Sequence, residues 1–204
     1  MDGKIIVIEG IDGSGKETQS RLLKENLEGK GKKAAVYCYP DYSSLYGERI
    51  KSFLYKKIDI SVDELFFLYL IDMIKDNRRI FEDVKEGKYV IMDRFFFSTI
   101  AYQSAAGFLY EKAKELIKLI DMPRPDKVFY INISSEVSME RKEKQKGKID
   151  MDKFESDKAF LSKVSGFYDR LKEESFHSNG WVEIDGNKSI EEIAYLIEKD
   201  LNLV

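Results

Sequence analysis

The sequence predicts an α/β protein with a doubly wound, parallel five-stranded sheet and helices on both of its faces. Short, continuous apolar runs alternate along the chain with longer stretches whose apolar residues recur at helical spacing. The continuous runs are typical of strands that are covered on both faces. Strands that alternate with helices in this way form parallel sheets.

Size and composition fit one folded domain over residues 1–204. Of the 204 residues 43% are apolar, which is enough for a sizeable core, and the formal net charge is −3. Low hydrophobicity and high net charge mark disordered chains, so disorder is not expected. The near-neutral charge gives no reason to expect a nucleic-acid partner.

The single cysteine, Cys38, excludes an intrachain disulfide, and we expect it to be a small core residue of a buried strand. We expect no signal peptide, because the amino terminus leads straight into a predicted strand. No apolar run reaches the ~18 residues of a membrane span, so no membrane association is expected. A reducing, cytoplasmic location is the expected compartment.

The first half of the chain divides at glycines and a proline. A strand is expected over 4–9, a helix that ends at Gly29, a strand over 33–39, and a short helix around 50–54 after Pro40. An apolar stretch from Val62 to about Lys85 predicts one long helix, which Gly87 ends.

The second half continues the alternation. Strands are expected over 89–92, 128–133 and 181–184. Helices are expected from 98 to about 120, with Gly107 as a candidate interruption, from 135 to near 148, over 154–177 and over 190–203. The lysine-rich stretch at 142–148 fits either a solvated helix end or a lid, at about 142–153, that carries positive charge to phosphates.

The turn after the first strand, Gly10–Lys16 (GIDGSGK), matches the phosphate-loop pattern of P-loop NTPases. Glycines let backbone N–H groups curl around phosphate oxygens, and the next helix points its positive end at the anion. Lys16 adds a mobile positive charge for the β- and γ-phosphates of ATP. Glu17 stands where the pattern has a Ser or Thr that binds Mg²⁺, and Thr18 follows it. Mg²⁺ is then held through water, through other carboxylates or through Glu17 itself.

Asp93 and Arg94 form a charged pair at the carboxyl end of a buried strand, where open α/β sheets bind their ligands. The planar guanidinium of Arg94 suits phosphate, and Asp93 suits a metal or a proton. The alternative is a salt bridge at the end of a strand.

The chain resembles the thymidylate kinase family of nucleoside monophosphate kinases over nearly its whole length. The resemblance rests on these residues: Ile8-Glu9 with the phosphate loop, Thr18-Gln19, Pro40, Tyr42, Asp93-Arg94, Ser98, Ala101-Tyr102-Gln103, Pro123–Asp126 and Arg141. It implies ATP-dependent phosphorylation of thymidylate (dTMP to dTDP) in pyrimidine deoxynucleotide synthesis, with Mg²⁺. It also implies a homodimer formed through helices that flank the sheet, such as the apolar one around 65–74.

The resemblance also assigns roles to residues. Catalytic roles fall to Lys16, Arg94, Asp12 and Asp93, and the metal to Asp12 and Glu155. Contacts to ATP fall to Gly10, Gly13, Ser14, Gly15, Lys16, Glu17, Thr18 and Arg141. Contacts to the acceptor fall to Tyr42, Tyr69, Met73, Arg94, Ser98, Thr99, Tyr102 and Gln103. In this set Arg94 bridges the two phosphates, and Tyr102 lies under the sugar, where it disfavours a ribose 2′-hydroxyl.

Two departures from the family bear on specificity. Met73 stands where an arginine usually donates a hydrogen bond to thymine, and a thioether cannot donate one. Lys75, Arg78 or Arg79 are candidates to compensate, and plain core packing is the other explanation for Met73. The lid has lysines where arginines are usual. A kinase for another deoxynucleotide or deoxynucleoside, and a regulatory nucleotide-binding module with little turnover, are the alternatives.

Overall fold

The computed structural model describes residues 3–146, 154 and 157–204. Its five strands form one sheet in the order β2-β3-β1-β4-β5, and every neighbouring pair is parallel. The strands are β1 (Lys4–Glu9), β2 (Ala34–Cys38), β3 (Tyr89–Asp93), β4 (Lys127–Asn132) and β5 (Trp181–Asp185). The predicted fold class is therefore confirmed.

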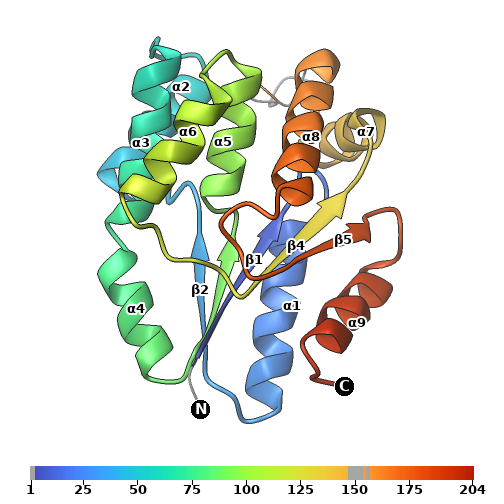
Figure 1. Ribbon diagram of the computed structural model, residues 1–204. Helices are drawn as coiled ribbons and strands as arrows, with labels where there is room; N and C mark the ends of the chain where they lie inside the picture. The colour runs from blue at the N-terminus through green and yellow to red at the C-terminus, as the bar shows by residue number, and fades with distance from the viewer. Residues whose placement is uncertain (1–2, 147–153, 155–156) are drawn as a thin grey trace.

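Helices cover both faces of the sheet (Figure 1). One face carries α1 (Lys16–Gly29) and α9 (Ile190–Asp200), and α7 (Ser135–Lys146) follows the carboxyl end of β4. The helices of the other face are α2 (Leu45–Leu54), α3 (Val62–Ile74), α4 (Asn77–Lys85), α5 (Phe96–Ala105), α6 (Tyr110–Leu119) and α8 (Lys158–Glu173).

Side chains of β1 alternate between two hydrophobic clusters because successive residues of a strand point to opposite faces. Ile6 and Ile8 pack with α1 and α9, whereas Ile5 and Val7 pack with the larger helical layer. The carboxyl end of β1 is thus fixed from both sides, and the phosphate loop begins there.

The prediction of a single long helix over 62–85 is wrong, because the helix is interrupted at Lys75 and Asp76, between α3 and α4. The side chains around the break are tied to the loop after β2. Lys75 Nζ lies 3.3 Å from an oxygen of Asp41, and Tyr39 donates a hydrogen bond to Asp76 at 3.1 Å. These tertiary contacts outweigh the helical propensity of the apolar stretch.

Other boundaries shift for local reasons. The interruption at Gly107 is confirmed, since its φ of +112° ends α5. The helix expected from 154 begins at Lys158, where the side chain of Asp157 caps it by accepting from the N–H of Phe160.

Cys38 is exposed, so its expected place in the core is wrong; β2 is an edge strand and leaves this residue at its open end. The predicted lid lies partly on residues 147–153, which are outside the described residues, as is Glu155. Within the described ranges, none of the helices has the length and apolar character needed to cross a membrane.

Candidate active site

The phosphate loop joins β1 to α1 in a conformation that depends on glycine. Gly10 has a φ of +147°, and a Cβ there would lie 2.4 Å from the carbonyl oxygen of Ile131 on β4. Gly15, at the start of α1, has a φ of +96°. Lys16 folds over the loop, and its Nζ donates to the carbonyl of Ile11 at 2.8 Å. The loop geometry matches what an anion-binding turn requires.

Lys16 is buried among charges of both signs. Burial and the nearby guanidinium of Arg94 lower its pKa to about 8, although Asp12, Asp93 and Glu9 act in the opposite direction. The ammonium group is therefore held where it would gain strongly from an added anion.

Arg94 pairs with Asp12 of the phosphate loop. Its Nη2 lies 2.6 Å from Oδ1 of Asp12, and Tyr102 donates its hydroxyl hydrogen to Oδ2 of the same carboxylate at 2.8 Å. Burial raises the pKa of Asp12, but the charges of Arg94, Lys16 and Lys142 outweigh it and hold that pKa well below its usual range. Asp12 is thus an ionised anchor for Arg94, and Lys142 of α7 is close enough to contribute.

The backbone of Arg94 is strained. Its φ is +66°, in the left-handed region, and its N–H donates to the carbonyl of Ile8 at 3.1 Å. A non-glycine residue in this region costs about 1–3 kcal/mol and persists only where its surroundings over-determine it. The cis peptide before Pro40 lies nearby, on the wall of the adjoining cavity.

Among the described residues, Asp93 and Glu17 are two carboxylates near the phosphate loop that are available to a cation. Among the described residues, the side chain of Asp93 takes part in no hydrogen bond or ion pair, and burial raises its pKa, with Glu17 among the charges that add to the rise. Glu17 is exposed at the start of α1. The described residues hold no cluster of three or more metal-binding side chains. One or two carboxylates suffice for Mg²⁺, which keeps several waters and binds substrate phosphates.

A cavity of about 70 Å³ lies beside Arg94 and collects residues from six parts of the chain. It is lined by Asp12, Tyr39, Pro40, Tyr42, Leu54, Tyr69, Met73, Arg94, Phe95, Ser98, Thr99, Tyr102 and Phe154. All but one of the predicted acceptor residues therefore meet at one place. The exception is Gln103, which does not line the cavity but follows Thr99 by one turn of α5.

Gln103 is fully buried, and neither its amide oxygen nor its amide nitrogen has a hydrogen-bond partner among the residues that the structure describes. A buried amide with both ends unpaired is costly, so it calls for a functional explanation. Met73 is buried in the core and also lines the cavity. Core packing and a place in the acceptor site, the two roles expected for it, are therefore compatible.

The three cations considered as substitutes for an arginine at position 73 lie elsewhere. Lys75 pairs with acidic residues at the α3–α4 break, Arg78 pairs with Glu82 on the surface, and Arg79 lies over the ring of Tyr37. None of the three lines the cavity.

Arg141, at the start of the predicted lid, spans the gap between the phosphate loop and the turn after β5. Its Nη1 donates to the carbonyl of Gly13 at 3.2 Å, and its Nη2 donates to that of Gly186 at 2.9 Å. It does not line the cavity beside Arg94, which we call the aromatic cavity.

One buried carboxylate at the site, Glu9, carries no role predicted from the sequence. It is fully buried at the end of β1 and accepts hydrogen bonds from the backbone of Phe95 and from the hydroxyls of Ser98 and Tyr168. Burial raises its pKa, against the lowering effect of Ser98 and Arg94. Two signals pointed to it: its position directly before Gly10 and its place in the stretch that carries the family resemblance.

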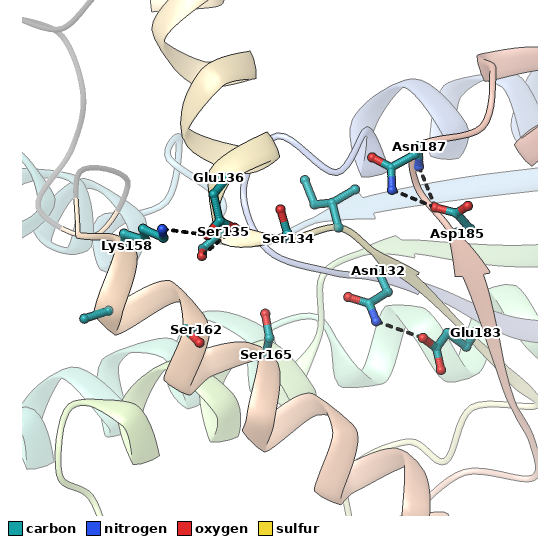
Figure 2. Close-up of a pocket in the computed structure, with 12 residues that line it drawn as sticks. Asn132, Ser134, Ser135, Glu136, Lys158, Ser162, Ser165, Glu183, Asp185 and Asn187 are labelled. Atoms are coloured by element: carbon teal, nitrogen blue, oxygen red, sulfur yellow. Dashed lines mark hydrogen bonds and ion pairs between the residues drawn. The ribbon is translucent and has the colours of Figure 1, made fainter.

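A larger cavity lies apart from these residues (Figure 2). It has a volume of about 850 Å³ and opens between α7, α8 and the ends of β4 and β5. Its polar walls are tied to each other: Lys158 pairs with Glu136, and Asn132 donates to Glu183. None of the predicted site residues within the described part of the chain lines it.

Comparison with known proteins gives one consistent result. A family model described as thymidylate kinase matches residues 8–197. Thymidylate kinase of Thermosipho africanus is 35% identical over 206 residues, covering 96% of this chain and 98% of that protein. Thymidylate kinase of Schizosaccharomyces pombe is 28% identical over 191 residues, covering 94% of this chain and 88% of that protein. The solved structure of thymidylate kinase from Candida albicans shares the fold, with a TM-score of 0.79 at 23% identity over 98% of this chain and 92% of that one.

Proposed function

The chain belongs to the thymidylate kinase family, and on that premise we propose how its residues bind and phosphorylate thymidylate. It is a nucleoside monophosphate kinase that transfers the γ-phosphoryl group of ATP to dTMP. The observation that carries our assignment is the Asp12–Arg94 pair, which joins the phosphate loop on one side to the aromatic cavity on the other.

The donor phosphates bind to the backbone amides of the loop from Gly10 to Lys16 and to the start of α1. Lys16 leaves the carbonyl of Ile11 and pairs with the β- and γ-phosphates. Arg141 contacts the rest of ATP from the far side of the loop, which its bonds to Gly13 and Gly186 support.

In the transfer step an oxygen of the acceptor phosphate attacks the γ-phosphorus while the bond to the β–γ bridging oxygen breaks, and ADP leaves. The acceptor phosphate is already a nucleophile at pH 7, so no general base is needed. Arg94 neutralises charge on the transferring group from a position that Asp12 has set in advance.

The acceptor lies in the aromatic cavity. Tyr69 stacks on the base, and Tyr102 lies under the sugar, where its ring leaves no room for a 2′-hydroxyl. Phe154 closes the cavity against Tyr102, with ring centroids 6.0 Å apart. Because the cavity holds only about 70 Å³, the nucleotide must displace part of this wall.

Gln103 binds the base edge in this account. An amide presents one acceptor and a donor group, which match the N3–H and O4 of thymine. The unpaired, buried state of Gln103 supports the assignment, since a bound base would satisfy both ends. The same amide turned over would match cytosine, so Gln103 supplies affinity without strong discrimination.

Mg²⁺ is the cofactor we propose, held by Asp93 and Glu17 together with water and the phosphates of ATP. When bound, it neutralises the phosphates and orients them for transfer. Asp12 suits this role less well than predicted, because both of its carboxylate oxygens already accept hydrogen bonds. Glu155 stays a prediction, since it lies outside the described residues.

A homodimer is the assembly we propose. Phe67, Ile71 and Ile74 form an exposed apolar stripe on α3, and Phe81 of α4 adds to it. The opposite side of α3 is buried in the core, so the stripe is free to meet a second copy. Sedimentation of Phe67→Glu as a monomer, against a dimeric wild type, tests the assignment.

The segment from about 142 to 153 acts as a lid in this proposal. Lys142 already lowers the pKa of Asp12, so a lysine of this segment reaches the site electrostatically. Closure over both nucleotides would exclude water and suppress ATP hydrolysis.

An ADP-release assay with a panel of nucleoside monophosphates at saturating MgATP tests the proposal as a whole. We expect the highest kcat/KM with dTMP and a lower one with ribonucleotides. Higher turnover on an unphosphorylated deoxynucleoside, or no turnover on any acceptor, would contradict it.

A further inference from the structure

We propose that Glu9 is a positioning residue for phosphoryl transfer: its carboxylate fixes the helix start and the hydroxyl that hold the guanidinium of Arg94. The inference rests on the proposed role of Arg94 in the transfer step. Glu9 itself contacts neither nucleotide in this account and acts through Ser98.

Both carboxylate oxygens of Glu9 are fully used. Oε1 accepts from the backbone N–H of Phe95 at 2.8 Å and from that of Ser98 at 3.3 Å. Oε2 accepts from the hydroxyl of Ser98 at 2.6 Å and from that of Tyr168 at 2.8 Å. Four donors converge on a side chain without solvent exposure, which is the surrounding an ionised carboxylate requires.

Glu9 caps α5 from another element. The residue at the N-cap position of α5 is Phe95, which cannot accept a hydrogen bond through its side chain. Glu9 accepts instead from the N–H of Ser98, the N3 group that an N-cap side chain usually satisfies, and from the N–H of Phe95, which a capping box satisfies from position N3. An anion at a helix start is favourable, so Glu9 ties α5 to the strand that leads into the phosphate loop.

The hydroxyl of Ser98 links Glu9 to Arg94. Nη1 of Arg94 donates to the hydroxyl oxygen of Ser98 at 3.1 Å and to the carbonyl of Gly10 at 3.2 Å, while Nη2 donates to Asp12. Two of these acceptors belong to the phosphate loop, and the third is the hydroxyl that Glu9 orients. The orientation of the Arg94 guanidinium is thus fixed by Ser98, which Glu9 holds, and by Gly10 and Asp12 of the phosphate loop.

Tyr168 extends the same cluster to α8. Its hydroxyl lies 2.7 Å from that of Ser98, and its ring stacks on Tyr130 of β4 at 5.0 Å. A buried charge is weak evidence for stability, because apolar packing often does as well. The carboxylate of Glu9 connects β1, α5 and α8 beside Arg94, so we explain its presence by the positions that it fixes for these elements and not by a gain in stability.

The test is a double-mutant cycle between Glu9→Gln and Arg94→Ala, read in kcat for the complete chain with dTMP and MgATP. The glutamine keeps the size of the side chain and one acceptor, but its NH₂ group donates where the carboxylate accepted. We expect Glu9→Gln to lower kcat by about tenfold to a hundredfold, with little change in KM for ATP. In the Arg94→Ala background the same substitution should cost no further activity.

Two variants serve as controls. Glu198→Gln removes a carboxylate that is nearly as buried but lies between α1 and α9, and it should leave turnover unchanged. Ser98→Ala keeps Glu9 and removes only the connecting hydroxyl, and it should be non-additive with Arg94→Ala even if Glu9→Gln folds poorly.

Unchanged kcat in a folded Glu9→Gln protein would overturn the inference, as would a loss that is fully additive with Arg94→Ala. Normal turnover in Arg94→Ala alone would be a different failure. It would remove the proposed role of Arg94, and with it the target on which Glu9 is inferred to act.

Discussion

The two sides of the Asp12–Arg94 pair are built differently. The side that we propose for the donor is a short run, Gly10–Lys16, with a backbone that depends on glycine and with one buried lysine. The acceptor side is a cavity assembled from side chains of the loop after β2, of α2, α3 and α5, and of Phe154. The donor side therefore depends on one local conformation, whereas the acceptor side depends on the whole fold.

The difference separates activity from specificity. In our proposal the loop amides and Lys16 contact phosphates and not a base, so substitutions there should remove turnover without changing which acceptor base is preferred. Substitutions at Met73 or Gln103 should leave the donor side intact and change only the acceptor.

The largest effect is expected at Lys16. Lys16→Ala should lower kcat by about 10³-fold, since it removes the charge placed on the transferring phosphates. The fold should persist. Burial lowers the pKa of Lys16, so its charged form is less stable in the folded protein than in the unfolded chain, and removing it should not destabilise the fold. Steady-state kinetics and thermal unfolding measure both effects, with Lys24→Ala of the same helix as control. Turnover close to that of the wild type would show that the loop does not bind the donor.

Arg94→Ala should lower kcat by about 10²-fold for every accepted base, because the residue acts on phosphate and not on the nucleoside. Its matched control is Arg78→Ala, which removes an arginine whose side chain is 91% exposed. A change in thermal stability alone, with kcat intact, would make the Asp12–Arg94 pair a structural salt bridge.

Affinity for ATP should fall at alkaline pH. The pKa of Lys16 is about 8 in the folded protein against an ordinary 10.5, so the free protein loses this charge above pH 8 and binding must restore it. Affinity should then drop by up to tenfold per pH unit above 8, while the contribution of Lys16 to folding stability rises between pH 8 and 10.5. Calorimetric titration from pH 7 to 9.5 measures the drop. Lys16→Arg should abolish it, and a pH-independent wild type would refute it.

Gln103→Leu should act on the acceptor side alone. Removing an amide whose two ends are unpaired should raise the melting temperature, while KM for dTMP rises by about tenfold through loss of the base contact. KM for ATP should stay constant. Thermal unfolding and steady-state kinetics of the variant decide the point, and a lower melting temperature with unchanged KM would assign Gln103 to the core.

The donor side could be predicted from the sequence because its residues are neighbours in the chain. The acceptor side could be gathered only through a family resemblance, since Tyr42, Tyr69 and Tyr102 meet through the packing of separate helices. The apolar pattern predicted the strands but predicted α3 and α4 as one helix. The interruption between them depends on an ion pair with Asp41, which is distant in the sequence. The role of Glu9 could not be predicted either, because its hydrogen-bond donors, Phe95, Ser98 and Tyr168, are distant from it in the sequence.

The measurement that tests the acceptor side most directly is the ratio of kcat/KM for dTMP to that for dCMP in the wild type and in Met73→Arg. Gln103 can turn to suit either base, and Met73 offers no donor, so we expect a shallow ratio in the wild type. Met73→Arg adds a donor that suits the O4 of thymine but not the amino group of cytosine, and should steepen the ratio by about tenfold. Met73→Leu, the apolar control, should leave it shallow. A steep wild-type ratio that Met73→Arg does not change would show that another residue reads the base.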